Sequence, residues 1–183
     1  MKFIKFKSSD FVLEPRYYFY GWKISSEMKA RPSVVAALKK AKRLLPKGYT
    51  LKLWDTERNY KTQILMSKSF AKRLILMYKN KNIPKLLARY AGSVSRRVLR
   101  LDTHRNGGAL DVAIVNDRGA ELYMGTDHDD LTEKATLWYY EKKKKLSIFE
   151  REARKNRLLL ARVMKMAGFR EYAPEWWHWS YET

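Results

Sequence analysis

Two short segments of this chain hold most of the side chains that could do chemistry together. The first runs from His104 to Asp111, and the second is a tryptophan-rich stretch that contains Glu175 and His178. Two neutral imidazoles and one carboxylate can bind Zn²⁺ and leave a fourth position open for water. A nearby glutamate can then take the proton of that water. The combination predicts a zinc hydrolase in which His104, Asp111 and His178 bind a single Zn²⁺ ion per chain.

Each of these residues also has a structural interpretation that needs no metal. His104 precedes two glycines in a loop, where a surface histidine is common, and His178 lies among aromatic residues, where a buried structural histidine is the simpler reading. Asp111 is harder to explain in this way, because a carboxylate inside an apolar strand costs several kcal/mol to bury unless it is paired or coordinated. Glu175 and His178 would point to opposite faces of an ideal strand, so a shared site requires a bulge or twist near Pro174.

The composition limits which sites the chain can build. Its 183 residues are 45% hydrophobic and 14% aromatic, which is typical of one folded globular domain. There is no cysteine, so disulfides, thiolate ligands and cysteine nucleophiles are excluded. A metal site must therefore use Asp, Glu and the three histidines.

The formal net charge of +20 is unusually high. Lys and Arg release counterions from nucleic-acid phosphates, and an anionic cell-wall polymer or membrane surface attracts them by the same physics. The basic residues are spread along the whole chain, and the densest run, Lys142 to Lys145, has no aromatic residue between its lysines to stack on a base. We therefore expect a solvated basic surface, with an anionic cell-wall polymer as a candidate partner and no nucleic-acid partner.

The sequence contains no signal for a membrane or for export. No apolar stretch reaches the roughly 20 residues that span a bilayer, and the basic start lacks the apolar core of a signal peptide. As it stands, the sequence favours a cytoplasmic protein. A periplasmic or secreted protein would need a leader that has been removed, or an export route without one.

The elements that must position the site follow from hydrophobic periodicity and end signals. Helical spacing predicts helices over 33–45, 61–79, 84–90 and 148–167, and alternation predicts strands over 49–54, 109–115, 169–172 and 176–181. A capping box at Ser147 and a stop at Gly168 delimit the longest helix, and Asp129 or Asp130 could cap a further helix that runs to about Glu141. This order indicates an α+β fold: a single zinc peptidase domain over residues 1–183, with a small antiparallel sheet that carries the zinc site and is flanked by helices.

Three motifs, in this order, resemble a known family. They are Trp54-Asp55-x-x-Arg58, His104-x-x-Gly107-x-Ala109-x-Asp111 and Glu175-Trp176-Trp177-His178. Together they resemble the VanX-type D-alanyl-D-alanine dipeptidases, which belong to the zinc D,D- and L,D-peptidases of bacterial cell-wall metabolism. Weaker matches, such as Met124-Gly125-Thr126-x-x-Asp129 and Asn156-Arg157, extend the resemblance over nearly the whole chain. The doubled tryptophan is its most specific part, because related carboxypeptidases usually carry Pro-Trp-His there.

The resemblance implies a role for each residue of the centre. His104, Asp111 and His178 would be the zinc ligands. Glu175 would be the general base that activates the water and then passes the proton to the leaving amine. Arg58 would stabilise the oxyanion of the tetrahedral intermediate, with a surface salt bridge as the alternative.

The resemblance also bears on the segment around residue 128. Asp129 would bind the free ammonium group of the substrate, and a helix N-cap is its alternative role. His128 has acidic neighbours and could belong to a second metal cluster. It matches a position that is typically aromatic and apolar in the family, so we leave it out of the metal site.

Three departures from the family pattern concern the substrate pocket. Asp102 stands where the family has a small hydroxyl residue near the C-terminal carboxylate of the substrate, which an ionised Asp would repel. Glu57-Arg58-Asn59 replaces an aromatic-Arg-Pro sequence, and Phe6 aligns with a tyrosine that would help to hold the dipeptide. Asp102 and Asp129 are therefore the substrate-binding candidates, and the zinc-binding residues match the family pattern in full while parts of the dipeptide pocket differ from it.

These observations favour zinc-dependent hydrolysis of a bond between D-amino acids, with free D-Ala-D-Ala as the expected substrate. The alternative within the enzyme class is a D,D- or L,D-carboxypeptidase, or a lysin-like endopeptidase, that acts on peptidoglycan stem peptides. The basic surface would then hold the protein on anionic wall polymers. Outside the enzyme class, the alternative is a basic polyanion-binding protein without catalysis.

Overall fold

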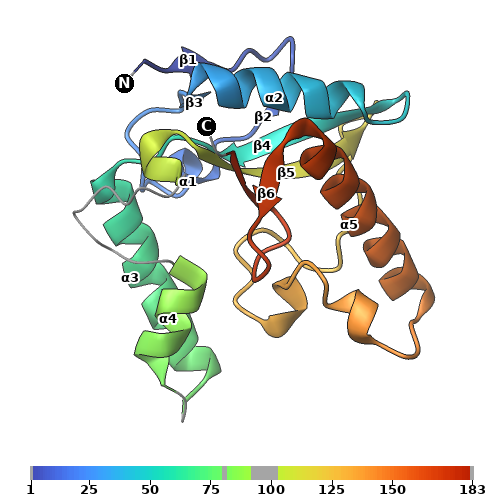
Figure 1. Ribbon diagram of the computed structural model, residues 1–183. Helices are drawn as coiled ribbons and strands as arrows, with labels where there is room; N and C mark the ends of the chain where they lie inside the picture. Colours follow the sequence, from blue (N-terminus) through green and yellow to red (C-terminus); the bar gives the residue numbers. More distant parts are fainter. Residues whose placement is uncertain (1, 80–81, 92–102, 182–183) are drawn as a thin grey trace.

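The computed structural model of the protein describes residues 2–79, 82–91 and 103–181. Its centre is a five-stranded sheet (Figure 1) with the order β2-β4-β5-β7-β6. In that order the strands are Val12–Leu13, Tyr49–Asp55, Ala109–Asn116, His178–Tyr181 and Phe169–Glu171. The short edge strand β2 pairs with β4 in parallel, and the other neighbours pair antiparallel. The α+β class and the small, mainly antiparallel sheet are confirmed.

Strand β5 lies at the middle of the sheet and is buried along all but its last residue. Its apolar and β-branched side chains suit a strand that is covered on both faces. Its register with β4 and β7 places Asp111 opposite both Asp55 and His178. Residues opposite one another on neighbouring strands have side chains in contact distance. The sheet itself therefore brings two acids and one histidine together.

The main core joins the sheet to two helices, α2 (Pro32–Arg43) and α5 (Ile148–Ala167), which also pack against each other. Pro32 occupies the first turn of α2, where its missing N–H costs nothing. Helix α5 begins with the predicted capping box of Ser147 and Glu150. It ends at Gly168, whose φ of 101° is the left-handed conformation expected there.

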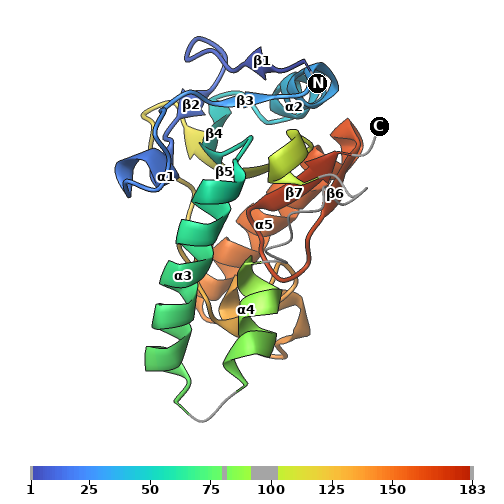
Figure 2. The same cartoon turned by 90° about the vertical axis from the view of Figure 1, so that its left-hand side faces the viewer.

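A hairpin of two helices, α3 (Tyr60–Met77) and α4 (Ile83–Ala91), extends away from the sheet (Figures 1 and 2). Asn59 caps α3 by accepting a hydrogen bond from the backbone N–H of Thr62. The hairpin has a smaller hydrophobic cluster of its own, which also includes Tyr17 from α1 (Arg16–Phe19) and Leu131. The helices predicted over 61–79 and 84–90 are thus confirmed.

The helix predicted from Asp129 or Asp130 to about Glu141 is wrong. This stretch forms irregular chain with two short 3₁₀ turns, η2 (Glu133–Ala135) and η3 (Tyr140–Lys142). The Asp130 carboxylate accepts hydrogen bonds from the backbone N–H and hydroxyl of Thr132, a local bond that competes with helix formation. Arg157 of α5 is buried beneath the stretch and donates to the carbonyls of Met124 and Thr136.

Three further elements complete the described chain. Strands β1 (Ile4–Lys5) and β3 (Lys29–Ala30) form a separate antiparallel pair, and the 3₁₀ turn η1 (His104–Asn106) leads into β5. Of the helices within the described ranges, none has the length and apolar character needed to cross a membrane.

Candidate metal centre

The three predicted ligands meet at the start of β5. Asp111 Oδ1 lies 3.2 Å from His104 Nε2 and 3.1 Å from His178 Nδ1, and the two ring nitrogens are 3.1 Å apart. Zn²⁺ with bonds of about 2.1 Å in tetrahedral geometry separates its ligand atoms by about 3.4 Å. The three atoms therefore already form a triangle of the size that a zinc ion requires, and among the described residues they are identified as a group able to hold a metal.

Each ligand is placed by a different local structure. Asp111 and His178 face each other in the β5–β7 register. His104 opens η1, which is held by a capping box of Thr103 and Asn106 and ends at Gly107 with a φ of 66°. This tight turn brings His104 back over the strand that follows it. Gly107 therefore shapes the approach of a ligand, and His104 is buried and not a surface residue.

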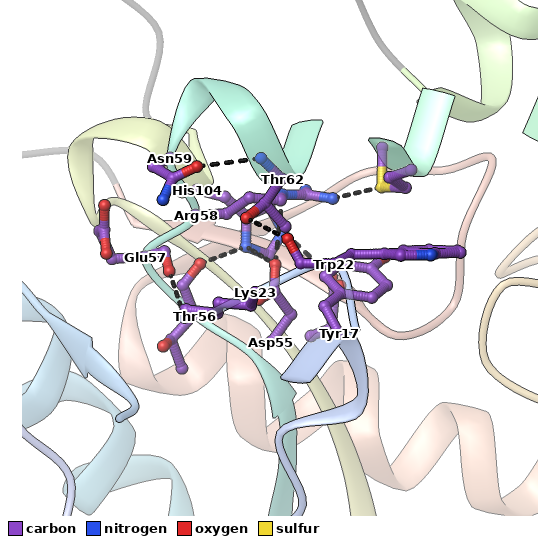
Figure 3. Close-up of polar contacts among 12 residues, drawn as sticks. Tyr17, Trp22, Lys23, Asp55, Thr56, Glu57, Arg58, Asn59, Thr62 and His104 are labelled. Atoms are coloured by element: carbon purple, nitrogen blue, oxygen red, sulfur yellow. Dashed lines mark hydrogen bonds and ion pairs between the residues drawn. The ribbon is translucent and has the colours of Figure 1, made fainter. Parts of the chain in front are cut away.

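Polar groups beside Nδ1, the ring nitrogen that does not face Asp111, orient the ring of His104 (Figure 3). Its Nδ1 lies 2.7 Å from the carbonyl oxygen of Thr56 and 3.0 Å from Asp55 Oδ2. With Nδ1–H donating to the Thr56 carbonyl, the lone pair of a neutral ring is on Nε2, which faces Asp111. Metal-binding histidines are characteristically held in this way by a carbonyl or carboxylate on the other ring nitrogen.

The charges of the cluster suit a bound cation. Burial acts to raise the pKa of Asp111, but His104 and hydrogen bonds from three imidazoles hold it well below its usual range. Burial lowers the pKa of His178, which favours the neutral ring that a metal needs. Burial and Arg58 also act to lower the pKa of His104, yet Asp111 and Asp55 raise it to about 9. A proton on His104 thus balances the carboxylates in the metal-free chain, at a place where a metal ion would supply the same positive charge.

Glu175 lies beside the cluster because the chain turns before β7 begins. The backbone N–H of Glu175 donates to Tyr172 and that of His178 donates to Glu175. The strand starts at His178, so the prediction of a strand from residue 176 is wrong by two residues. In this turn Glu175 Oε2 comes within 4.0 Å of His178 Nδ1. A turn, and not a bulge within a strand, places both side chains on one side.

The Glu175 carboxyl group has the environment of a proton acceptor. Burial raises its pKa well above the ordinary value, and the nearby charges of Asp111 and Asp129 act in the same direction. A carboxylate whose pKa is raised is a stronger base than one in water and can hold a proton between two steps.

Arg58 follows β4 and points into the same region (Figure 3). Its side chain is 9% exposed, with Nε 3.2 Å from Asp55 Oδ2 and the guanidinium 5.3 Å from the centre of the Tyr17 ring. Burial alone would lower its pKa, but Asp55 and other acidic groups of the site raise it above the ordinary value. The surface salt bridge considered for Arg58 is therefore wrong, because the pair is buried.

Asp129 is held in an uncommon backbone conformation. Its φ is 60°, it is buried, and its carbonyl oxygen accepts a hydrogen bond of 2.8 Å from Arg73 of α3. The hydroxyl of Tyr17 donates to Oδ1 at 3.1 Å, while Oδ2 has no hydrogen-bond partner among the described residues. Burial raises its pKa. The helix N-cap considered for Asp129 is wrong, and one buried carboxylate oxygen is left for a cation.

The structure adds two residues that the sequence reasoning missed or set aside. Tyr17 supplies a hydroxyl at the site, whereas Phe6, with which the family tyrosine was aligned, is buried in the main core beside Phe11. His128 stays outside the ligand triangle but lies 3.1 Å from Asp111 Oδ2. Neither residue belongs to a spaced motif, so only their position in the fold reveals them. Asp102 lies outside the described residues.

Comparison with known proteins gives a family and two relatives. A family described as D-Ala-D-Ala dipeptidase matches residues 28–183. A D-alanyl-D-alanine dipeptidase from Synechocystis sp. is 33% identical over 81 residues, which cover 42% of this chain and 33% of that protein. One from Escherichia coli is 31% identical over 75 residues, 41% of this chain and 35% of that protein. The chain thus aligns with about a third of the length of these curated relatives.

Proposed function

The chain belongs to the D-Ala-D-Ala dipeptidase family, and from this premise we propose that it is a zinc-dependent peptidase that hydrolyses the bond between two D-amino acids. Free D-Ala-D-Ala is the substrate expected first. The observation that carries the proposal is the triangle of His104, Asp111 and His178 beside the partly buried Glu175.

The residues fit a zinc ion by number, type and spacing. Three ligand atoms leave a fourth tetrahedral position, as in catalytic zinc sites, and the second ring nitrogen of His104 has the carbonyl and carboxylate partners that such sites use. When bound, zinc lowers the pKa of a coordinated water to about 7 and polarises a carbonyl group.

Glu175 would move the proton. Its raised pKa lets the carboxylate accept a proton from the attacking water and hold it until the peptide nitrogen leaves as an amine. The same carboxyl group can take the proton from water and give it to the leaving nitrogen, provided that it stays beside the scissile bond. The turn between Tyr172 and His178 supports this role, because it holds Glu175 beside the metal ligand His178.

Arg58 and Asp129 would each bind a charged group of the reacting peptide, the oxyanion and the free ammonium group respectively. The guanidinium of Arg58 pairs with Asp55 through Nε, whereas its Nη1 donates to a weak acceptor, the thioether sulfur of Met66. That N–H can therefore turn to a stronger acceptor, such as the oxyanion of the tetrahedral intermediate. The unpartnered Oδ2 of Asp129 would accept a hydrogen bond from the free ammonium group of a short peptide.

Glu175→Gln tests the role of the base. We expect the variant to bind one Zn²⁺ with unchanged affinity and to lose turnover of D-Ala-D-Ala by about 10³-fold or more. Glu171→Gln is a matched control, because Glu171 lies on β6 and accepts a hydrogen bond from Trp138 outside the centre. Near-normal turnover in Glu175→Gln, or a wild-type protein that neither holds zinc nor gains activity when zinc is added, would refute the proposal.

Product analysis on a set of peptides tests the substrate. D-Ala-D-Ala, its N-acetylated form and an intact stem pentapeptide would be compared at equal concentration. Cleavage of the free dipeptide and loss of cleavage after N-acetylation are expected if Asp129 binds the ammonium group. Cleavage of the pentapeptide without the dipeptide would replace the dipeptidase by an enzyme that acts on stem peptides.

A further inference from the structure

We propose that His128 is a positioning residue for the metal centre: its ring donates to Asp111 Oδ2 and thereby holds Asp111 as a ligand through Oδ1 alone. The inference uses one part of the proposed function, the binding of a metal by His104, Asp111 and His178. It does not depend on which peptide is cleaved.

The two oxygens of Asp111 are divided between two neighbourhoods. Oδ1 faces His104 and His178 at 3.2 and 3.1 Å, which is the metal side. Oδ2 points the other way and lies 3.1 Å from His128 Nε2. Because a carboxylate only accepts, the hydrogen of this bond is on His128. A hydrogen bond that holds the second oxygen on the side away from the metal opposes rotation of the carboxylate and disfavours binding of the ion through both oxygens.

The ring of His128 is itself fixed. Its side chain is fully buried, and its centre lies 4.9 Å from the ring of Trp54 and 5.3 Å from that of Trp177. Tyr17 closes a further side at 6.0 Å. Rotation of the imidazole would break these contacts and leave Oδ2 of Asp111 buried without its donor, which is unfavourable.

The backbone that carries His128 is also anchored on both sides. Arg157 binds the carbonyl of Met124, and Arg73 binds the carbonyl of Asp129. The other ring nitrogen of His128, Nδ1, faces Asp129 Oδ2 at 3.5 Å, which is too long for a hydrogen bond. His128 thus separates the metal ligand from the proposed ammonium site and contributes its hydrogen bond only to the ligand.

The test compares donor and non-donor side chains at this position. His128→Gln keeps an N–H donor, His128→Met has a similar length without one, and His128→Phe keeps an aromatic ring without one. Thr126→Val is the matched control, because it removes a partly buried acceptor in the same loop, the hydroxyl to which Trp176 Nε1–H donates, without touching a ligand. Zinc affinity would be measured by competition with a chelator, and Co²⁺ absorption would report the coordination number.

We expect His128→Met and His128→Phe to bind zinc about 10–100-fold more weakly, the usual effect of removing a partner of a metal ligand. The intensity of the Co²⁺ bands should fall as Asp111 becomes free to use both oxygens and the coordination number rises. His128→Gln should recover most of the affinity, and Thr126→Val should keep it. Circular dichroism of the metal-free variants identifies any that do not fold. If one of the two non-donor variants does not fold, the other still tests the inference.

The inference is overturned if a folded non-donor variant binds zinc as tightly as the wild type, or if Gln and Met lower the affinity equally. Failure of the proposed function gives another result: the wild type would bind zinc and the His128 series would behave as expected, but no peptide would be cleaved. A wild type that binds no zinc would overturn both.

Discussion

Asp111 links the residues of the candidate metal centre, because its side chain contacts all three histidines of the protein. A buried carboxylate with a single partner would be a liability. Here each oxygen is satisfied, and the hydrogen bonds keep the group ionised even though burial opposes this. The position of one residue thus accounts for the burial of a charge, the orientation of two rings and the place of a cation.

Tyr17 should contribute to substrate binding more than to the chemical step. In Tyr17→Phe the hydroxyl that bonds Asp129 Oδ1 is lost, so the carboxylate is less well oriented toward an ammonium group. Loss of a hydrogen bond to a charged group costs about 1.5–3 kcal/mol, so we expect KM for D-Ala-D-Ala to rise about tenfold or more while kcat changes little.

Steady-state kinetics would check this prediction, with Tyr90→Phe as the control. Tyr90 is a buried tyrosine of the same cluster between the helices, so its loss of a hydroxyl has a comparable effect on packing. An unchanged KM in Tyr17→Phe, or a fall in kcat alone, would contradict the role assigned to Tyr17.

The residues found from the sequence are those with a fixed local spacing. His104 and Asp111 share one segment, and Glu175 and His178 share another, so motif and chemistry could be recognised together. Tyr17 and His128 reach the site from α1 and from an irregular stretch, and only the packing of Trp54 and Trp177 around His128 shows why it is there. Contacts of this kind depend on tertiary structure and leave no pattern in one sequence.

At the level of elements, η1 should be sensitive to a side chain at its end. Gly107 has a φ of 66°, and an added Cβ would lie 2.5 Å from the Phe3 ring and 3.2 Å from the backbone nitrogen of Arg31. Gly107→Ala should therefore lower the free energy of unfolding by more than the roughly 1–2 kcal/mol of the left-handed conformation. It should also weaken zinc binding, because η1 carries His104.

Gly119→Ala supplies the control for this prediction. Gly119 also has a positive φ, 77°, but an added Cβ would meet nothing within 4 Å. Urea unfolding of both variants separates the backbone cost, which they share, from the clash, which only Gly107→Ala has. Equal losses of stability and equal zinc affinities would show that the close approach at η1 does not matter.

A network of ion pairs at the β2 edge of the sheet should make stability depend on pH. Lys52 Nζ lies 2.7 Å from Glu14 and 2.9 Å from Glu121, and Arg16 Nε lies 2.9 Å from Glu14. Partial burial acts to raise the pKa of Glu14, but Lys52 and Arg16 hold it below its ordinary value of 4.5. Because the pKa is lower in the folded state, the stabilisation is complete above about pH 4.5 and is lost as the pH falls through the folded value.

Glu14→Gln should therefore lower the free energy of unfolding at pH 7 and have little effect at pH 3. Glu14 is partly exposed, so screening limits the loss at pH 7 to the order of 1 kcal/mol. Denaturant unfolding at both pH values would check it, with the exposed Glu152→Gln of α5 as control. A deficit of the same size at pH 3 would mean that the ion pairs are not its source.

Elements with a strong period and clear ends could be predicted, and those that depend on long-range bonds could not. Helix α5 has a capping box and a terminal glycine, and it was found at its true limits. The stretch after Asp129 has acidic residues that resemble a helix start, but Arg157 and the Asp130–Thr132 bonds hold it in irregular form. The turn at Glu175 was likewise hidden, because alternation of aromatic residues resembles a strand there.

Over the whole molecule, the acidic residues are distributed unlike the basic ones. Asp55, Asp111, Asp129 and Glu175, four of only 19 acidic residues, are gathered in or beside the metal centre. Their removal from the surface makes the outside of the protein still more basic than the net charge of +20 suggests. The same distribution makes the centre a place of negative charge in which a cation is stabilised.

Zinc should therefore stabilise the whole fold, since its ligands come from η1, β5 and β7. Binding to the folded state adds RT ln(1 + [Zn²⁺]/Kd), about 4 kcal/mol at a free concentration 1,000 times Kd. For a chain of this length we expect Tm to rise by about 8–16 °C over that in a chelator. Thermal unfolding of the wild type and of His178→Ala, with and without zinc, measures this. The variant should show little change, and an equal rise in both would place the stabilising zinc at another site.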